Sequence, residues 1–147
     1  EYIEDQIERL EGLAYQKKIK LEFLSGDEHK IISDVMLLGR AFSNVTSNCI
    51  RYAKETVQIS VEAAGDRLKI TIRDDGPGIS EADLPHLFDR FYKGKNGNHG
   101  LGLSIAKRSM EYMGGNIEAE SSPEGAIFMI TLPQDCRSFA VEEWTEV

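Results

Sequence analysis

The sequence predicts an α+β domain: a two-layer α/β sandwich whose mixed, mostly antiparallel sheet is covered on one face by about three helices. Between residues 33 and 53, apolar side chains recur at alternating steps of three and four, as on one side of an α-helix. Within residues 57–72 and 117–132, apolar and polar side chains alternate, as in paired strands. Single strands do not alternate strictly with helices, which disfavours a doubly wound parallel sheet.

Two helices and one strand are expected in the first part of the chain. Apolar side chains at helical spacing predict a short helix over Tyr2–Ala14, and alternation with charged residues predicts a strand over Ile19–Phe23. The longest helix follows over Ser33–Ala53. Ser33 is its expected N-cap, because a hydroxyl can accept from a free N–H of the first turn, and Asp34 suits the positive end of the helix dipole.

A β-hairpin, a long loop, another helix and two closing strands complete the prediction. The hairpin joins Val57–Val61 to Leu68–Ile72. Glycine, aspartate and asparagine make Asp74–His99 typical of a functional loop, with a short helical piece near Ala82–Phe88. The last expected elements are a helix over Gly100–Met113, stopped by Gly114 and Gly115, and strands over Ile117–Ala119 and Ala126–Leu132.

Composition narrows the class of protein. The chain has 147 residues and a formal charge of −8, and 41% of its residues are hydrophobic, which is typical of one folded domain. The acidic balance argues against nucleic acid as a partner. No apolar run approaches the roughly 20 residues that cross a bilayer, so this domain is expected to make no membrane contact. Cys49 and Cys136 lie in no metal or disulfide pattern, which favours a reducing, cytoplasmic location.

One side of the longest predicted helix carries a polar set made of Asn44, Asn48, Arg51 and Tyr52. Asparagine is a poor helix former, so two asparagines one turn apart on a half-buried flank indicate a polar ligand. An asparagine carbonyl oxygen suits Mg²⁺, which takes its other ligands from water and phosphate oxygens. Taken alone, this helix is equally compatible with solvated polar residues on an amphipathic surface.

A first glycine turn, Asp75-Gly76-Pro77-Gly78-Ile79, follows directly after a predicted strand. Glycine lets the backbone approach a flat ligand closely, because no Cβ intervenes. A carboxylate at the strand end can accept a hydrogen bond from the exocyclic amine of adenine. The alternative is an ordinary Asp-Gly turn.

A second glycine turn, His99-Gly100-Leu101-Gly102-Leu103, opens a predicted helix, where free N–H groups and the helix dipole favour phosphate. Its spacing matches neither the Rossmann fingerprint nor a P-loop. Lys93 and Lys95 precede this turn, where they either face a polyphosphate or are solvated loop charges.

Together these motifs resemble the nucleotide-binding domain of sensor histidine kinases, in the superfamily of gyrase, heat-shock chaperone, histidine kinase and mismatch-repair ATPases. Asn44–Tyr52 looks like the N box, Asp75–Gly78 the G1 box, Phe88–Lys93 the F box and Gly100–Leu103 the G2 box. The resemblance implies a Bergerat-type ATP-binding fold. It covers 19–133, preceded by the end of a helical region or linker at 1–18 and followed by an acidic tail at 134–147.

The resemblance implies that the domain binds ATP and Mg²⁺. Asn48 would hold the metal, Asp75 would accept from the adenine amine, and residues 94–99 would form a lid. The implied catalytic residues are Asn44, Asn48, Arg51 and Lys93. The implied nucleotide contacts are these four with Tyr52, Asp75, Gly76, Gly78, Ile79, Tyr92, His99, Gly100, Leu101, Gly102 and Leu103.

The resemblance also implies partners. None of the three histidines lies in a phosphoacceptor motif, so we expect a dimerisation and phosphoacceptor domain upstream and a cognate response regulator downstream. The full-length protein would be a homodimer anchored in the cell membrane, with this domain in the cytoplasm.

Departures from the family pattern keep rival functions open. Asn44 stands where ATP-hydrolysing members carry a glutamate, which favours phosphoryl transfer over hydrolysis. Ala126 stands where threonine is common, and Asn98 lies where a further glycine is usual. The alternatives are an ATP-hydrolysing clamp of the same superfamily, a serine kinase built on the same domain, and a non-catalytic protein-binding module with a degenerate pocket.

Overall fold

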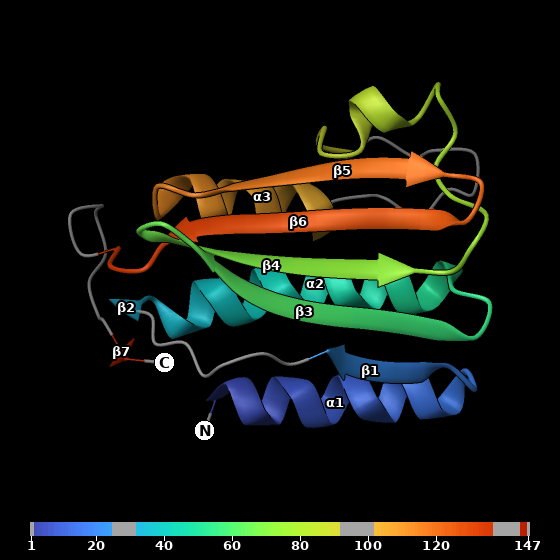
Figure 1. Cartoon of the computed structure of the whole chain (residues 1–147), viewed down its shortest axis with the longest axis horizontal. Coiled ribbons are helices and arrows are strands. Elements are labelled where there is room, and N and C mark those ends of the chain that lie inside the picture. The colour runs from blue at the N-terminus through green and yellow to red at the C-terminus, as the bar shows by residue number, and fades with distance from the viewer. Residues whose placement is uncertain (1, 25–31, 92–101, 137–144, 147) are drawn as a thin grey trace.

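The computed structural model of the chain describes residues 2–24, 32–91, 102–136 and 145–146. These residues form a sheet backed by helices (Figure 1). In chain order the elements are α1 (Tyr2–Gln16), β1 (Lys20–Leu24), β2 (Ile32–Ser33), α2 (Val35–Tyr52), β3 (Thr56–Ala64), β4 (Arg67–Asp74), the 3₁₀ turn η1 (Leu84–His86), α3 (Gly102–Tyr112), β5 (Asn116–Ser122), β6 (Gly125–Pro133) and β7 (Thr145–Glu146).

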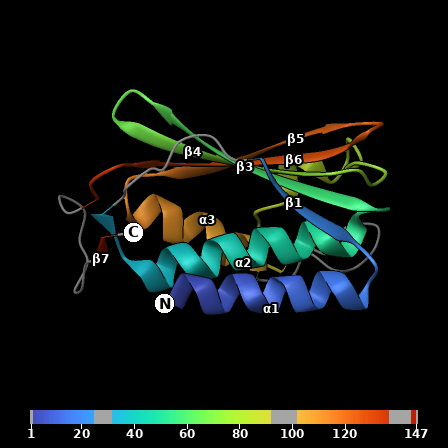
Figure 2. The same ribbon diagram turned by 60° about the horizontal axis from the view of Figure 1, so that its bottom comes forward.

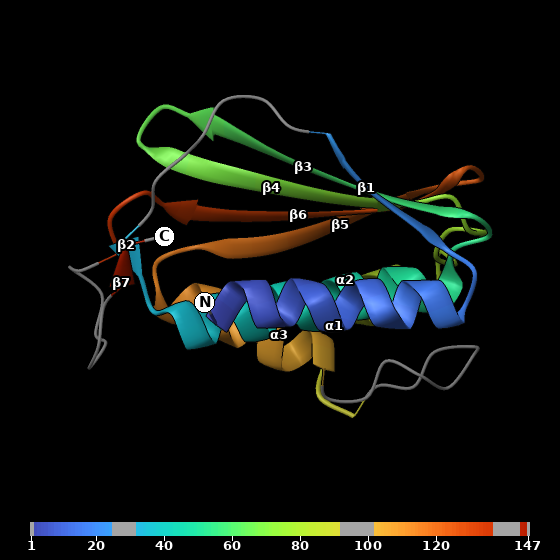
Figure 3. The same cartoon turned by 90° about the horizontal axis from the view of Figure 1, so that it is seen from below.

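The main sheet has five strands in the order β1-β3-β4-β6-β5. β1 runs parallel to β3, and the other neighbours are antiparallel. Figures 2 and 3 show α1, α2 and α3 side by side on one face of this sheet. The predicted two-layer sandwich with a mixed sheet and one helix-covered face is therefore confirmed.

The core lies between the sheet and the helices, and α2 contributes a large share of it. On the sheet side, the inward residues of β4 and β6 are paired in register, as Ile70 with Ile130 and Ile72 with Phe128. On the helix side, α2 buries Leu38, Ala41, Val45 and Cys49, which recur at steps of three or four. Each large side chain buried in this way contributes about 1.5–3 kcal/mol. Within the described residues, no helix is both long and apolar enough to cross a membrane.

The predicted N-cap of α2 was wrong by one residue. Asp34, not Ser33, caps the helix: its Oδ1 accepts from the N–H groups of Met36 at 2.9 Å and Leu37 at 3.1 Å. Ser33 is fully buried and pairs in β2 with Thr145 of β7. Its hydroxyl finds no hydrogen-bond partner in the part of the chain that the structure describes. Because Ser33 is paired in β2 and its side chain is buried there, the next residue takes the cap position.

Other boundaries differ from the predictions by a few residues. The helical piece expected over 82–88 is the three-residue η1. Gly114 ends α3 as expected, with a φ of +81° that favours glycine. The pairing of β2 with β7 was not predicted, because two-residue strands carry too short a pattern to detect. The predicted helix start at Gly100 and Leu101 lies outside the described residues.

The cap assignment predicts different effects for two neighbouring substitutions. Asp34→Ala removes the acceptor of the first turn and is expected to lower the free energy of unfolding by about 1 kcal/mol. Ser33→Ala removes a buried hydroxyl that lacks a partner among the described residues, so stability should stay the same or rise slightly. Urea denaturation of both variants checks this. A larger loss in Ser33→Ala than in Asp34→Ala contradicts the assignment.

Candidate functional site

A cavity of about 280 Å³ opens where α2, the end of β4 and the turn after β4 meet. Its walls come from three parts of the chain that are distant in sequence. The residues that line it are Asn48, Tyr52, Asp74, Pro77, Gly78, Ile79, Ser80, Asp83, Ala126 and Phe128. Two residues of the polar side of α2, Asn48 and Tyr52, therefore share one cavity with part of the first glycine turn, Pro77, Gly78 and Ile79.

Asp74 is the buried acidic group of this cavity, with only 4% of its surface exposed. Its Oδ1 accepts from the N–H groups of Gly76 at 3.0 Å and Ala126 at 3.1 Å. The thiol of Cys49, beneath it on α2, donates to the same carboxylate. Burial raises the pKa of Asp74 above its ordinary value, and the two N–H donors act in the opposite direction.

Two glycines let the backbone come close to this carboxylate and its turn. At Gly125, a Cβ would lie 2.0 Å from the carbonyl oxygen of Asp74, and its φ is +139°. At Gly78, a Cβ would lie 2.3 Å from the carbonyl oxygen of Ser122, and its φ is +81°. A side chain at Gly125 would force β6 away from the end of β4, and one at Gly78 would force the turn away from the end of β5.

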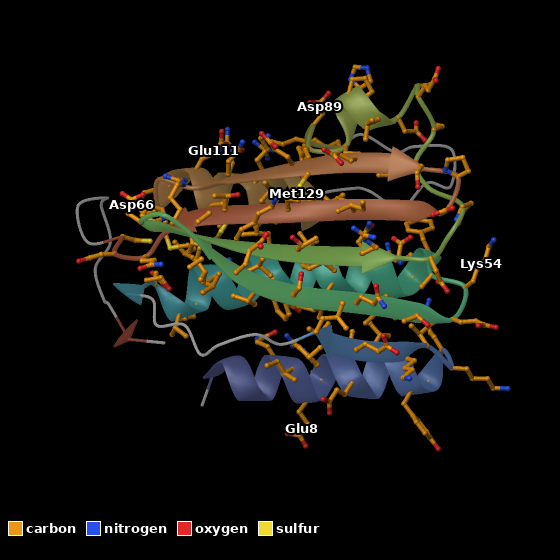
Figure 4. All side chains as sticks on the ribbon, in the orientation of Figure 1. Glu8, Lys54, Asp66, Asp89, Glu111 and Met129 are labelled. Carbon is orange, nitrogen blue, oxygen red and sulfur yellow. The ribbon has the colours of Figure 1, made fainter. Side chains whose placement is uncertain are left out.

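Asp75, the residue predicted to accept from adenine, does not line the cavity. Its carboxylate accepts from the N–H groups of Lys54 at 2.8 Å, Glu55 at 3.1 Å and Thr56 at 3.2 Å, and so joins the α2–β3 connection to the end of β4. Figure 4 shows Lys54 at that end of the sheet. Asp75 instead borders a groove of about 310 Å³ that also contains Arg73.

The burial pattern of β4 explains this difference. Successive side chains of a strand point to opposite faces, so residues 68, 70, 72 and 74 share the inward face. Asp74 continues this inward series. Asp75 is the next residue, so the alternation does not place it on the inward face. Burial opposes the ionisation of Asp75, but the N–H groups of Glu55, Thr56 and Lys54 together outweigh it and lower its pKa.

The predicted polar set on α2 is divided by the structure. Asn48 is 8% exposed and lines the cavity, as does Tyr52. Asn44 instead donates from Nδ2 to the carbonyl oxygen of Gly102 at 3.0 Å, which joins α2 to the first residue of α3. Arg51 is exposed in the last turn of α2 and is not among the residues that line the cavity.

The second glycine turn is described only in part. Gly102 is the first residue of α3, and Leu103 is buried in the core. The contact of Asn44 with Gly102 brings the start of α3 next to α2. The predicted contacts at Tyr92, Lys93, His99, Gly100 and Leu101, and the predicted lid at 94–99, lie outside the described residues.

The donor set of the cavity fits Mg²⁺ bound together with a phosphate ligand. No group of three or more histidine, cysteine, aspartate or glutamate side chains is placed to hold a metal within the described residues. Asn48 offers a nearly buried amide oxygen, which no described residue uses in a hydrogen bond. Mg²⁺ needs few protein ligands when waters and phosphate oxygens complete its coordination.

Six of the residues that line the cavity are not among those predicted from the sequence: Asp74, Pro77, Ser80, Asp83, Ala126 and Phe128. The alternation along β4 indicates that Asp74 faces inward, and the alternation along β6 indicates the same for Ala126 and Phe128. Ser80 and Asp83 lie in irregular backbone after the turn, where no periodicity indicates which side chains face inward.

The lowered pKa of Asp75 predicts a pH-dependent effect on stability. Ionised Asp75 stabilises the fold above the ordinary aspartate pKa of about 3.9, and this contribution is lost as the pH falls through the lower pKa of the folded state. Asp75→Asn should therefore cost about 1–2 kcal/mol at pH 7 and progressively less below pH 4.

Urea denaturation across this pH range measures the effect. The exposed Asp66 of the hairpin turn provides the matched control, Asp66→Asn, which should change stability little at either pH. A cost of Asp75→Asn that stays constant from pH 7 to pH 3 would contradict a role for its charge.

Comparison with known proteins finds a matching protein family. The family described as "Histidine kinase-, DNA gyrase B-, and HSP90-like ATPase" matches residues 33–135. The signal transduction histidine-protein kinase AfsQ2 of Streptomyces coelicolor is 44% identical over 99 residues, covering 63% of this chain and 18% of AfsQ2. The sensor histidine kinase CssS of Bacillus subtilis is 32% identical over 134 residues, covering 91% of this chain and 29% of CssS.

Solved structures agree on the fold. The catalytic domain of histidine kinase ThkA superposes with a TM-score of 0.82 at 23% identity, covering 92% of each chain. The mycobacterial sensor histidine kinase MprB superposes with a TM-score of 0.77 at 26% identity, covering 90% of this chain and 93% of that one. The chain spans less than a third of the length of AfsQ2 and of CssS. It belongs to the family of histidine kinase-, DNA gyrase B- and HSP90-like ATPases, and its relatives named here are histidine kinases.

Proposed function

We propose that this chain is the catalytic ATP-binding domain of a two-component sensor histidine kinase. In this proposal the cavity between α2 and the turn after β4 holds ATP with Mg²⁺, and the γ-phosphate is presented to a histidine on a separate dimerisation domain. The observation that carries the proposal is the buried carboxylate of Asp74 in a cavity that also holds the amide of Asn48. Family membership supports it.

The adenine end of the cavity is assigned to Asp74 in place of Asp75. A carboxylate offers about four acceptor sites. Backbone N–H groups use two of them on Oδ1 of Asp74, and the Cys49 thiol uses a third. The remaining capacity suits the exocyclic amine of adenine. Guanine has a carbonyl oxygen at that position, which a carboxylate repels, so the site should prefer ATP to GTP.

The phosphate end is assigned to Asn48 and the start of α3. Asn48 would hold Mg²⁺, which neutralises phosphate charge when bound. The hydrogen bond from Asn44 to Gly102 keeps the first turn of α3 beside α2, and the N-terminal turn of a helix favours an anion. Arg51, Lys93 and the glycine turn 100–103 remain predicted phosphate contacts, and Tyr92 and His99 remain predicted nucleotide contacts.

The chemistry at this end favours phosphoryl transfer to another domain over hydrolysis. A neutral amide cannot take a proton from water, so Asn44 does not serve as a general base. Its Nδ2 is also occupied by the carbonyl oxygen of Gly102. The residues of this chain thus bind and orient the nucleotide, which is the main protein contribution to phosphoryl transfer.

The proposal includes partners beyond this chain. The acceptor histidine would lie on a dimerisation domain of the same protein, and its phosphoryl group would pass to an aspartate of a response regulator. The full-length protein would be a homodimer anchored in the membrane. Support for these partners comes from relatives that are named histidine kinases and are more than three times as long as the region they share with this chain.

Calorimetric titration with Mg-ATP tests the proposal. The wild-type chain should bind Mg-ATP and bind Mg-GTP much more weakly. Asp74→Asn replaces the charged acceptor and should raise the Kd for Mg-ATP about tenfold or more. Asp75→Asn is the matched control at the adjacent position, and its Kd should stay within about threefold of the wild-type value because Asp75 does not line the cavity.

Circular dichroism confirms that each variant is folded at the titration temperature. Absence of Mg-ATP binding by the wild-type chain would favour the protein-binding module. A loss of affinity in Asp75→Asn, with none in Asp74→Asn, would return the adenine contact to Asp75.

A further inference from the structure

Lys107 of α3 makes two directed contacts although it lies outside the cavity. Its Nζ donates to the carbonyl oxygen of Ile117 in β5 at 3.2 Å. The same Nζ lies 4.8 Å from the centroid of the Phe88 ring, within the range of a cation–π contact. The side chain is only partly exposed, so both contacts are partly shielded from water.

Phe88 in turn contacts a residue of the cavity wall. Its ring meets the ring of Phe128 edge to face, with centroids 6.4 Å apart and an interplanar angle of 89°. Phe128 is 1% exposed and lines the cavity. One row of contacts therefore runs from Lys107 through Phe88 to the cavity wall.

The segment 79–91, which contains Phe88, forms part of that wall. It contributes Ile79, Ser80 and Asp83 to the lining of the cavity. Figure 4 shows Asp89 on this segment, beyond the edge strand β5, and η1 contacts β5. Besides the hydrogen bond of Ile79 to Ser121, the segment is anchored by Leu87, which is almost fully buried, and by Phe88.

We propose that Lys107 is a positioning residue for nucleotide binding, which holds the Phe88 ring against Phe128 and thereby fixes segment 79–91 as one wall of the cavity. The proposal rests on the proposed function. An ammonium group prefers the electron-rich face of the ring, and its bond to Ile117 fixes where the charge sits. A neutral side chain of similar length would pack against Phe88, but it would not select one orientation of the Phe88 ring.

Two variants of Lys107 and one control test this role. Lys107→Met keeps the length and apolar stem but removes the charge, and it should raise the Kd for Mg-ATP about three- to tenfold. Lys107→Arg keeps a cation above the ring and should restore a Kd within about twofold of wild type. Arg108→Met, at the exposed neighbouring position of α3, is the matched control and should bind as wild type.

Phe88→Leu removes the ring and leaves Lys107 its bond to Ile117. It should raise the Kd as much as Lys107→Met does, and combining both substitutions should add little, because they act on the same contact. In protein labelled with fluorophenylalanine, the ¹⁹F resonance that disappears in Phe88→Leu belongs to Phe88. That resonance should shift or broaden in Lys107→Met and keep its position in Arg108→Met.

The outcomes separate this proposal from the proposed function. If the wild-type chain binds Mg-ATP and Lys107→Met binds equally well with only a lower Tm, Lys107 is merely structural and the proposal is overturned. Unchanged affinity in Phe88→Leu overturns it as well, whether or not Lys107→Met folds. Failure of the wild-type chain to bind Mg-ATP refutes the proposed function, and an unmoved Phe88 resonance in Lys107→Met then overturns the ring contact itself.

Discussion

The buried carboxylate of Asp74 is the constraint on which the cavity depends. It sits where β4 ends, and its Oδ1 joins that strand to the following turn through Gly76 and to β6 through Ala126. A buried carboxylate is costly unless such donors surround it. Because the backbone must come close enough to supply them, Gly125 cannot carry a side chain. The same arrangement leaves the Asp74 carboxylate able to accept a further hydrogen bond in the cavity, and we assign that bond to the adenine amine.

The helix layer supplies the other half of the cavity. α2 packs its apolar side on the sheet and turns Asn48 and Tyr52 toward the residues that follow β4. Asn44 joins α2 to the start of α3, where N–H groups without helical partners favour phosphate. In our proposal, the adenine end and the phosphate end of the site thus lie along one helix. This division suits a nucleotide, and it accords with the ATPase family to which the chain belongs.

Much of the fold was predictable because each long helix or strand shows the periodic spacing of apolar residues in its own sequence. The stripe on α2 and the alternation of β3, β4 and β6 gave the layers and the covered face. The same alternation, followed two residues beyond Ile72, places Asp74 on the inward face of β4. By contrast, the contact of Lys107 with Phe88 joins residues far apart in sequence through tertiary packing, which no local pattern encodes. The pairing of β2 with β7 was not predictable because each of these strands has only two residues, too few for a detectable alternation.

A crystal structure of the chain with Mg²⁺ and a non-hydrolysable ATP analogue tests the central assignment most directly. The account predicts the exocyclic amine of adenine at about 3 Å from the carboxylate of Asp74. Asp75 should still accept from the N–H groups of Lys54, Glu55 and Thr56. An adenine amine bound to Asp75, or a nucleotide lying in the groove beside Arg73 and not in the cavity, would contradict it.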